Sequence, residues 1–95
     1  MTDETRPVLG VERAVLGLVM TETVAAREKF GEQNDLTDDA WLAVLVEEVG
    51  EAADVMNDRR LGKLDDAIGS AALAEEVVQI AAVAVRWLAS MGRRG

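Results

Sequence analysis

The sequence predicts an all-α protein, a helical bundle of three to four main helices that is completed by oligomerisation. Apolar residues recur at helical spacing through most of the chain, and no segment alternates as a strand does. The one proline, Pro7, precedes this pattern. Because 95 residues lie near the lower size limit of a self-sufficient core, we expect a single domain over 1–95.

The first helix is expected from Val8 to about Phe30, after a loose N-terminus over 1–7. Gly31 suits its C-terminal end, because glycine adopts the left-handed conformation that closes many helices. Apolar residues recur in this helix at helical spacing, and the series is Val8, Val11, Val15, Leu18 and Val19, followed by Glu22 and Ala26.

The second helix is expected from Thr37 to about Asn57. Thr37 is a good N-cap, and the two aspartates that follow it suit the positive end of the helix dipole. The segment 57–70 contains two glycines and mixed charge, so it is predicted to connect two helices, with a short helical turn around 64–68.

The third helix is expected over about 71–91, with Ser70 as its N-cap and a short basic tail at 92–95. The run VVQIAAVAV at 77–85 makes this helix apolar on nearly every side. Three helices cannot bury every face of such a helix, so we expect a homo-oligomer, either a dimer or a tetramer.

The composition argues against several classes of partner and metal site. The net charge of −8 argues against nucleic acid and anionic membranes as partners. The chain has no cysteine and no histidine, so a metal site would be rich in oxygen ligands and would favour Mg²⁺, Mn²⁺ or Ca²⁺. The N-terminus is polar, and Arg86 ends the longest apolar run, 80–85, before it reaches membrane-spanning length. We therefore expect a soluble cytoplasmic protein.

Glutamates interrupt the apolar stripe of the second helix. The stripe contains Trp41 and, two turns later, Glu48. Glu51 lies one turn further on, and Glu47 can reach the same edge of the helix. A charged group is rarely placed on such a stripe without a partner.

The third helix repeats this arrangement. Its stripe consists of Leu73, Glu76, Ile80, Val83 or Ala84, and Trp87. Gln79 lies one turn after Glu76, and Glu75 lies beside it. If the two helices pack face to face, their carboxylates meet, and a divalent cation would relieve the cost of burying them together.

Two simpler interpretations remain open at this point. The acids at 47, 48 and 51 can form a solvated face, with the core on Val46, Val49 and Ala53. Alternatively, the glutamates can form salt bridges with arginines, the candidates being Arg13, Arg27, Arg59 and Arg60.

The segments KFGEQNDLTDDAWLAVLVEEVGEAADVMND and LAEEVVQIAAVAVRWL resemble the MazG-like group of all-α nucleoside triphosphate pyrophosphohydrolases, over roughly 27–91. Glu48 and Glu51 match the ExxE motif of that group. Glu76 and Gln79 stand where its ExxD motif would be, so a neutral amide replaces the family aspartate. This amide can ligate a metal through its carbonyl oxygen but brings no charge.

The resemblance implies hydrolysis of a nucleoside triphosphate to the monophosphate and pyrophosphate, with Mg²⁺ or Mn²⁺ as the cofactor. The implied metal ligands are Glu48, Glu51, Glu76 and Gln79. Glu47 or Glu75 would orient or deprotonate the attacking water. The candidates for substrate contacts are Lys29, Gln33, Trp41, Asn57 and Arg59, although Lys29 also suits a solvated helix end and Trp41 also suits the core.

Two other functions compete with this enzyme. A chain weakened by Gln79 would bind a nucleotide or a partner protein without turnover. A plain helical oligomerisation domain with surface glutamates would bind neither Mg²⁺ nor Mn²⁺.

Overall fold

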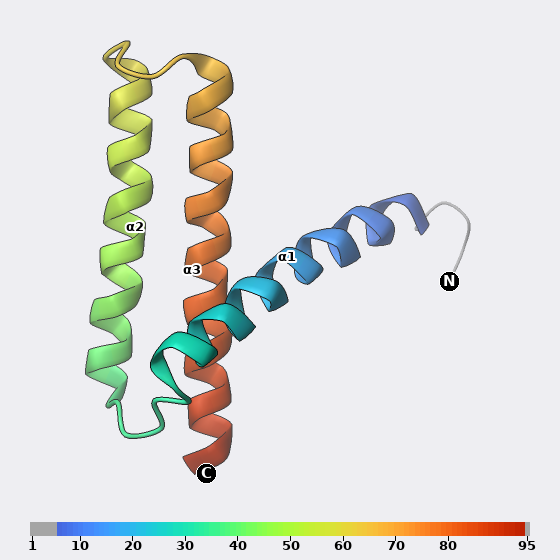
Figure 1. Cartoon of the computed structure of the whole chain (residues 1–95), viewed down its shortest axis with the longest axis vertical. Coiled ribbons are helices and arrows are strands. Elements are labelled where there is room, and N and C mark those ends of the chain that lie inside the picture. Colours follow the sequence, from blue (N-terminus) through green and yellow to red (C-terminus); the bar gives the residue numbers. More distant parts are fainter. Residues whose placement is uncertain (1–5, 95) are drawn as a thin grey trace.

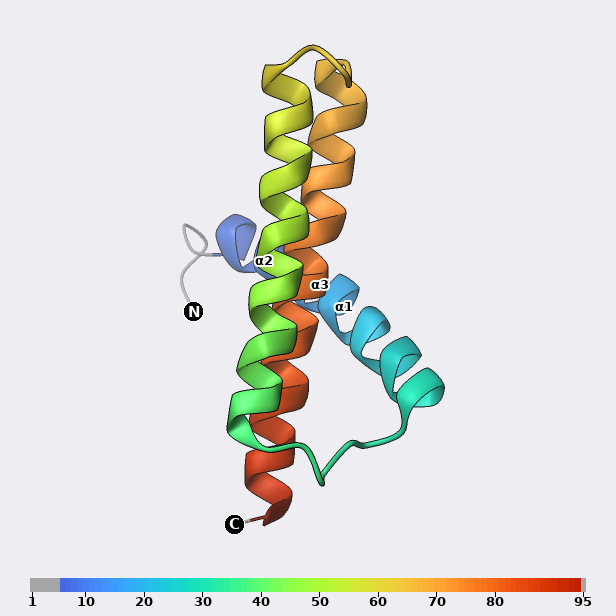
Figure 2. The ribbon, with the colours of Figure 1, turned by 90° about the vertical axis from the view of Figure 1, so that its left-hand side faces the viewer.

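The structure is a computed structural model that describes residues 6–94 as three helices and no strand. The helices are α1 (Arg6–Phe30), α2 (Asp38–Arg60) and α3 (Asp66–Arg94). Helices α2 and α3 form a long antiparallel hairpin, and α1 crosses one side of α3 and then projects away from it (Figures 1 and 2). The all-α prediction is therefore confirmed over this range, with three helices.

Helix α1 begins at Arg6, two residues before the predicted start, so residues 6 and 7 are not part of a loose terminus. A proline is tolerated here because the first-turn amides have no helical acceptor. The predicted end is confirmed: Gly31 has a φ of 75°, and its N–H donates to the Arg27 carbonyl at 2.8 Å. The rest of the predicted loose terminus, 1–5, lies outside the described residues.

Helix α2 has the predicted N-cap. The Thr37 hydroxyl accepts a hydrogen bond from the Ala40 N–H at 3.2 Å. The helix ends at Arg60, three residues beyond the predicted end. It closes at Gly62, which has a φ of 75° and donates its N–H to the Arg59 carbonyl at 3.0 Å.

Helix α3 begins earlier than predicted. Its cap is Asp65, whose carboxylate accepts from the Ile68 N–H at 2.8 Å, and not Ser70. The connection is therefore 61–65, and the predicted turn at 64–68 merges into the first turn of α3. In the sequence Gly69 suggests a loop, but it lies within α3, where the Arg59 side chain packs against it. A Cβ at Gly69 would lie 2.2 Å from Cγ of Arg59.

Helix α3 also ends later than predicted, at Arg94, so residues 92–94 are helical and not a separate tail. The arginines at 93 and 94 suit the negative end of the helix dipole. Residue 95 lies outside the described part of the chain.

The inward stripe of α2 is confirmed. Trp41 and Ala52 are buried, and Glu48 is half-buried between them. By contrast, Val46 and Val49 are 60% and 48% exposed. The alternative that placed these valines in the core and the glutamates in solvent is therefore wrong for Glu48. On α3, the predicted stripe of Leu73, Glu76, Ile80, Val83 and Trp87 is likewise buried or half-buried.

An ion-pair network, formed by Arg27, Glu32, Asp38, Arg93 and Arg94, holds the loop before α2 against the end of α3. Glu32 pairs with Arg27 at 2.7 Å and with Arg93 at 3.7 Å. Asp38 pairs with Arg94 at 2.8 Å and accepts from the Trp87 indole N–H at 2.9 Å. These contacts connect the loop before α2 and the first turn of α2 to the C-terminal end of α3.

Helix α3 is long and apolar enough to cross a membrane by length and composition alone. This corrects the expectation that no segment reaches that length, because the helix continues beyond the apolar run in both directions. The finding is weak evidence for a membrane span, since the central helix of a helical protein satisfies the same criteria. Only 17% of the most apolar window is buried within the chain, so much of its apolar surface is open.

Candidate metal centre

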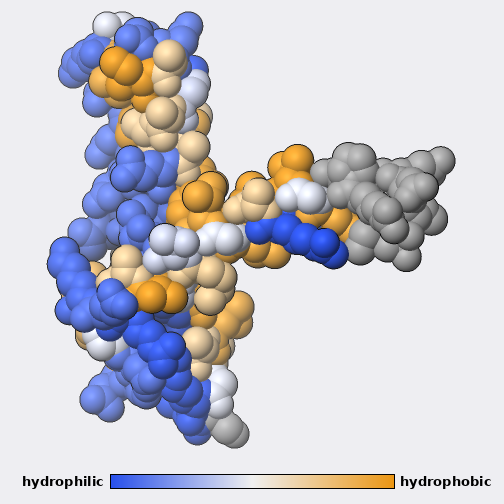
Figure 3. All heavy atoms as spheres, turned by 45° about the vertical axis from the view of Figure 1, so that its right-hand side comes forward, coloured by the Kyte–Doolittle hydropathy of each residue, from blue (hydrophilic) through white to orange (hydrophobic). Residues whose placement is uncertain are grey.

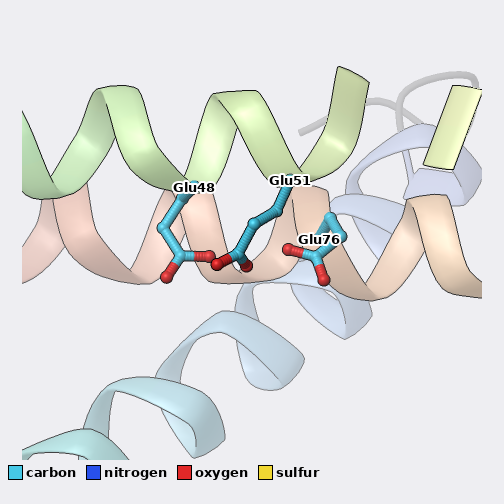
Figure 4. A group of neighbouring side chains, drawn as sticks. All are labelled: Glu48, Glu51 and Glu76. Carbon is cyan, nitrogen blue, oxygen red and sulfur yellow. The ribbon is translucent and has the colours of Figure 1, made fainter. Parts of the chain in front are cut away.

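Three glutamates converge on one side of the hairpin. Glu48 and Glu51 come from adjacent turns of α2, and Glu76 comes from α3 (Figure 4). One carboxylate oxygen from each lies within 4.8 Å of the others. We call these residues the acidic triad. Cation ligands at about 2.0–2.6 Å stand about 4–5 Å apart when they face each other across the ion, so the triad is compact enough to share one ion.

The acidic triad is electrostatically unfavourable as it stands. Burial raises the pKa of Glu48 above its ordinary value, and the neighbouring carboxylates of Glu51 and Glu76 raise it further. Burial likewise raises the pKa of Glu76, with Glu51 and Glu75 adding to the effect. Both pKa shifts mean that the folded chain resists ionising these groups together.

No described side chain supplies a positive charge to the triad. Among the side chains of residues 9–94, the ion pairs lie elsewhere and involve Arg27, Arg59, Arg93 and Arg94. The alternative that the triad glutamates form salt bridges with arginines is therefore wrong among these residues. The Oε2 atom of Glu76 is buried and has no hydrogen-bond partner there. An orphaned anionic oxygen beside two other carboxylates is a donor set that fits Mg²⁺ or Mn²⁺.

The other acids and Gln79 surround the triad. Glu47 and Glu75 are exposed, and each raises the pKa of the triad residue beside it, Glu48 and Glu76 respectively. Gln79 is half-buried and lies with Glu48 on the wall of a groove between the three helices.

This central groove has a volume of about 390 Å³, within the usual range of small-molecule sites. Of the acidic triad, Glu48 lines this groove, which extends to Lys29 and Phe30 at the C-terminal end of α1. Its lining residues come from all three helices and are Glu22, Ala25, Ala26, Lys29, Phe30, Val44, Glu48, Gln79, Val83 and Arg86.

The structure does not bring the predicted substrate-binding residues together. Lys29 lines the central groove, and Gln33 lines a smaller hollow that shares Phe30 and Val44 with it. Trp41 is completely buried, which supports its core role and leaves no ring face open to a base.

The remaining two candidates lie at the far end of the hairpin. Asn57 is exposed and accepts a hydrogen bond from Arg60 at 3.0 Å. Arg59 packs across Gly69 and pairs with Asp66 at 3.9 Å. They are not among the residues that line the central groove.

Comparisons with known proteins identify no relative: no family model, no curated protein and no solved structure matches the chain. The likeness to MazG-like enzymes therefore rests on the motif residues quoted above.

Two groove residues were not predicted. Glu22 is half-buried on α1, and Arg86 is half-buried on α3. Glu22 follows the apolar series of the first helix, and a charged residue at such a position could have indicated a functional site. Arg86 lies on the same face of α3 as Glu76 and Gln79, at helical spacing. In the sequence, Arg86 stands out only as the residue that ends the apolar run 80–85.

Proposed function

We propose that the chain is a Mg²⁺-dependent nucleotide pyrophosphohydrolase of the MazG-like type, with Mn²⁺ as an alternative ion. It would cleave an NTP or dNTP to the monophosphate and pyrophosphate. The observation that carries the proposal is the acidic triad: three carboxylates from two helices meet with no ion-pair partner among the side chains of residues 9–94, beside a groove large enough for a small molecule. The motif resemblance over 27–91 supports the same activity.

In this mechanism Glu48, Glu51 and Glu76 hold the ion, and the Gln79 carbonyl oxygen is a fourth candidate ligand. Bound Mg²⁺ would supply Lewis-acid polarisation of the phosphate oxygens and offset the repulsion between an acidic protein and its anionic substrate. Glu47 or Glu75 accepts a proton from the attacking water, whose oxygen bonds to the α-phosphorus. The bond from this phosphorus to the bridging oxygen breaks, and pyrophosphate leaves.

Purified protein with Mg²⁺ and a panel of NTPs and dNTPs tests this proposal. Release of pyrophosphate together with the matching monophosphate is expected for at least one nucleotide. Absence of turnover across the panel, with both Mg²⁺ and Mn²⁺, would rule out the enzyme.

A weakened binding module is the second candidate, because Gln79 brings no charge to its position in the groove. It predicts that the protein binds Mg²⁺ and a nucleotide but releases no pyrophosphate. Calorimetry with a nonhydrolysable triphosphate analogue separates the two candidates. A helical domain without a site would bind neither metal nor nucleotide.

We also propose that the protein is a homo-oligomer. Its radius of gyration is 15.8 Å, whereas a compact chain of this length has about 12 Å. Its accessible surface is 6675 Å², whereas a compact monomer of this mass exposes about 5,300 Å². Much of the excess is apolar, as along the projecting part of α1, where Val11 is 66% and Leu16 is 60% exposed (Figure 3). Surfaces of this kind mark subunit interfaces.

Sedimentation equilibrium at micromolar concentration tests the oligomer. The expected mass is an integral multiple, two or four, of the 10.2 kDa chain. Leu16→Glu should shift the distribution toward the monomer. A wild-type protein that remains monomeric at high concentration would overturn this part of the proposal.

A further inference from the structure

Arg86 carries a positive charge that the described chain does not balance. It is half-buried on α3, and among residues 9–94 it forms none of the ion pairs that hold Arg27, Arg59, Arg93 and Arg94. Burial lowers its pKa, and no carboxylate offsets that effect. A partly buried guanidinium with no ion-pair partner among residues 9–94 is unusual in a protein with a net charge of −8.

Neutral groups hold Arg86 in place. Its guanidinium carbon lies 5.3 Å from the centre of the Trp41 ring and 5.8 Å from that of Phe30. It donates a hydrogen bond to the side-chain oxygen of Gln33. Gln33 has a φ of 55°, a left-handed conformation that non-glycine residues seldom adopt. These contacts orient the guanidinium but leave most of its donors and its whole charge available.

Arg86 lines the same groove as Glu48 of the acidic triad. It lines both the central groove and the adjoining hollow of about 180 Å³. Gln79 and Arg86 are seven residues apart on α3, which places them about 10 Å apart along the helix axis on the same face. The groove therefore has carboxylates at one end and a fixed cation at the other. Lys29 adds a second cation on its wall, with its Nζ 5.1 Å from the centre of the Phe30 ring.

This arrangement suits a polyphosphate better than a nucleobase. The ring of Trp41 is buried and cannot stack on a base. The ring of Phe30 is 55% exposed, but Lys29 and Arg86 lie 5.1 and 5.8 Å from its centre, so this part of the groove presents two cations beside the one accessible ring. The planar fork of a guanidinium matches phosphate oxygens.

We propose that Arg86 binds the terminal phosphates of the triphosphate substrate, the part that leaves as pyrophosphate, with Lys29 as the second contact. The inference rests on the proposed function, because it takes the acidic triad as the place of the metal and the scissile bond. Gln33 acts as a positioning residue through its hydrogen bond to Arg86.

Calorimetry with inorganic triphosphate and inorganic pyrophosphate, each with and without Mg²⁺, tests the proposal without requiring turnover. Arg86→Gln should weaken the binding of both anions by about 10- to 100-fold, the usual loss for a charge-assisted contact. Arg86→Lys, which keeps the charge but not the fork, should lose less. Mg²⁺ affinity measured without an anion should not change.

Arg93→Gln is the matched control, because it removes the same charge from the same helix at a residue already paired with Glu32. Its anion affinity should stay within about twofold of wild type. Circular dichroism must show the helical content of both variants unchanged. If Arg86→Gln does not fold, Gln33→Ala provides the test, and it should weaken pyrophosphate binding while the helices persist.

The outcomes distinguish this inference from the proposed function. Arg86-dependent binding of inorganic triphosphate in a protein that turns over no nucleotide would uphold the anion site and overturn the enzyme. Conversely, turnover with KM and pyrophosphate inhibition unchanged in Arg86→Gln would uphold the enzyme and overturn the role of Arg86. Equal weakening in Arg86→Gln and Arg93→Gln would also overturn it, because the effect would then come from net charge alone.

Discussion

The molecule contains two groups of acids with opposite electrostatic character. In the ion-pair network, hydrogen bonds from Arg27 and from Arg94 lower the pKa values of Glu32 and Asp38, respectively. In the acidic triad, burial and neighbouring carboxylates raise the pKa values of Glu48 and Glu76. The acids of the first group have cationic partners, whereas those of the second have none among the side chains that the structure describes.

This difference separates a structural role from a functional one. Arginines from α1 and α3 satisfy the network, which connects the loop before α2 to the end of α3. The triad costs stability unless protons or a metal ion neutralise it, and a group kept at such a cost is a candidate for function.

Loss of a triad carboxylate should affect activity more than any other change considered. Glu48→Gln or Glu51→Gln should reduce pyrophosphate release by more than about 100-fold, because even groups that only support metal ligands cost 10- to 100-fold when removed. Asp54→Asn, which neutralises an exposed acid on the same helix, is the control and should retain activity. Similar losses in all three variants would indicate a general effect of charge instead of a metal site.

A smaller effect is expected from restoring the family motif. Gln79→Asp should tighten Mg²⁺ binding by about tenfold or more, since a carboxylate is a stronger ligand than an amide for a hard cation. If the amide weakens the native site, the rate of turnover should also rise. Titration calorimetry measures the Mg²⁺ affinity, and an assay of pyrophosphate release measures the turnover. Unchanged Mg²⁺ affinity would place Gln79 outside the ligand set.

Mg²⁺ should stabilise the fold through the triad and not through the network. At a free concentration of about ten times its Kd, the gain is about 1.4 kcal/mol, measured as a rise in Tm. Glu76→Gln should abolish most of this gain, whereas Asp38→Asn should keep it although its starting Tm is lower. A loss of the gain in both variants would mean that the two acidic groups do not differ in the proposed way.

The smallest effects are those of charge removal without metal. At neutral pH, Glu48→Gln should raise stability, by less than about 1 kcal/mol because the group is half-exposed and screened. Asp38→Asn should lower it, because it removes an anion that accepts from Arg94 and Trp87. Urea titrations of both variants measure these changes, and shifts of the same sign would contradict the contrast.

The two groups of acids should also affect the pH dependence of stability in opposite directions. Because the pKa values of Glu48 and Glu76 are raised by folding, their contribution is fully favourable below the ordinary value of 4.5 and is lost as the pH rises through the raised values. Because the pKa of Asp38 is lowered, its contribution is present above the ordinary value of 3.8 and is lost as the pH falls through the lowered value. In metal-free buffer, Glu48→Gln should therefore gain most over wild type at neutral pH and little at pH 4, which urea titrations at both pH values would show.

Local sequence signals predict three main helices and place Glu48 and Glu76 on stripes that can face the core, although they leave a solvated face open for Glu48. The helical period fixes which residues share a face, so the positions of Glu48 and Glu76 on inward stripes could be predicted without coordinates. Thr37 and Gly31 marked a helix start and a helix end because caps are local signals.

The contacts that those residues make depend on how the helices pack. Gly69 and Ser70 suggested a loop, but the contact of Arg59 across Gly69 and the Asp65 cap make this segment helical. The convergence of the triad depends on the register of α2 against α3. The groove and its Arg86 depend on the angle at which α1 crosses α3. These features arise from contacts between residues far apart in the chain, and helical periodicity, which is local, carries no information about them.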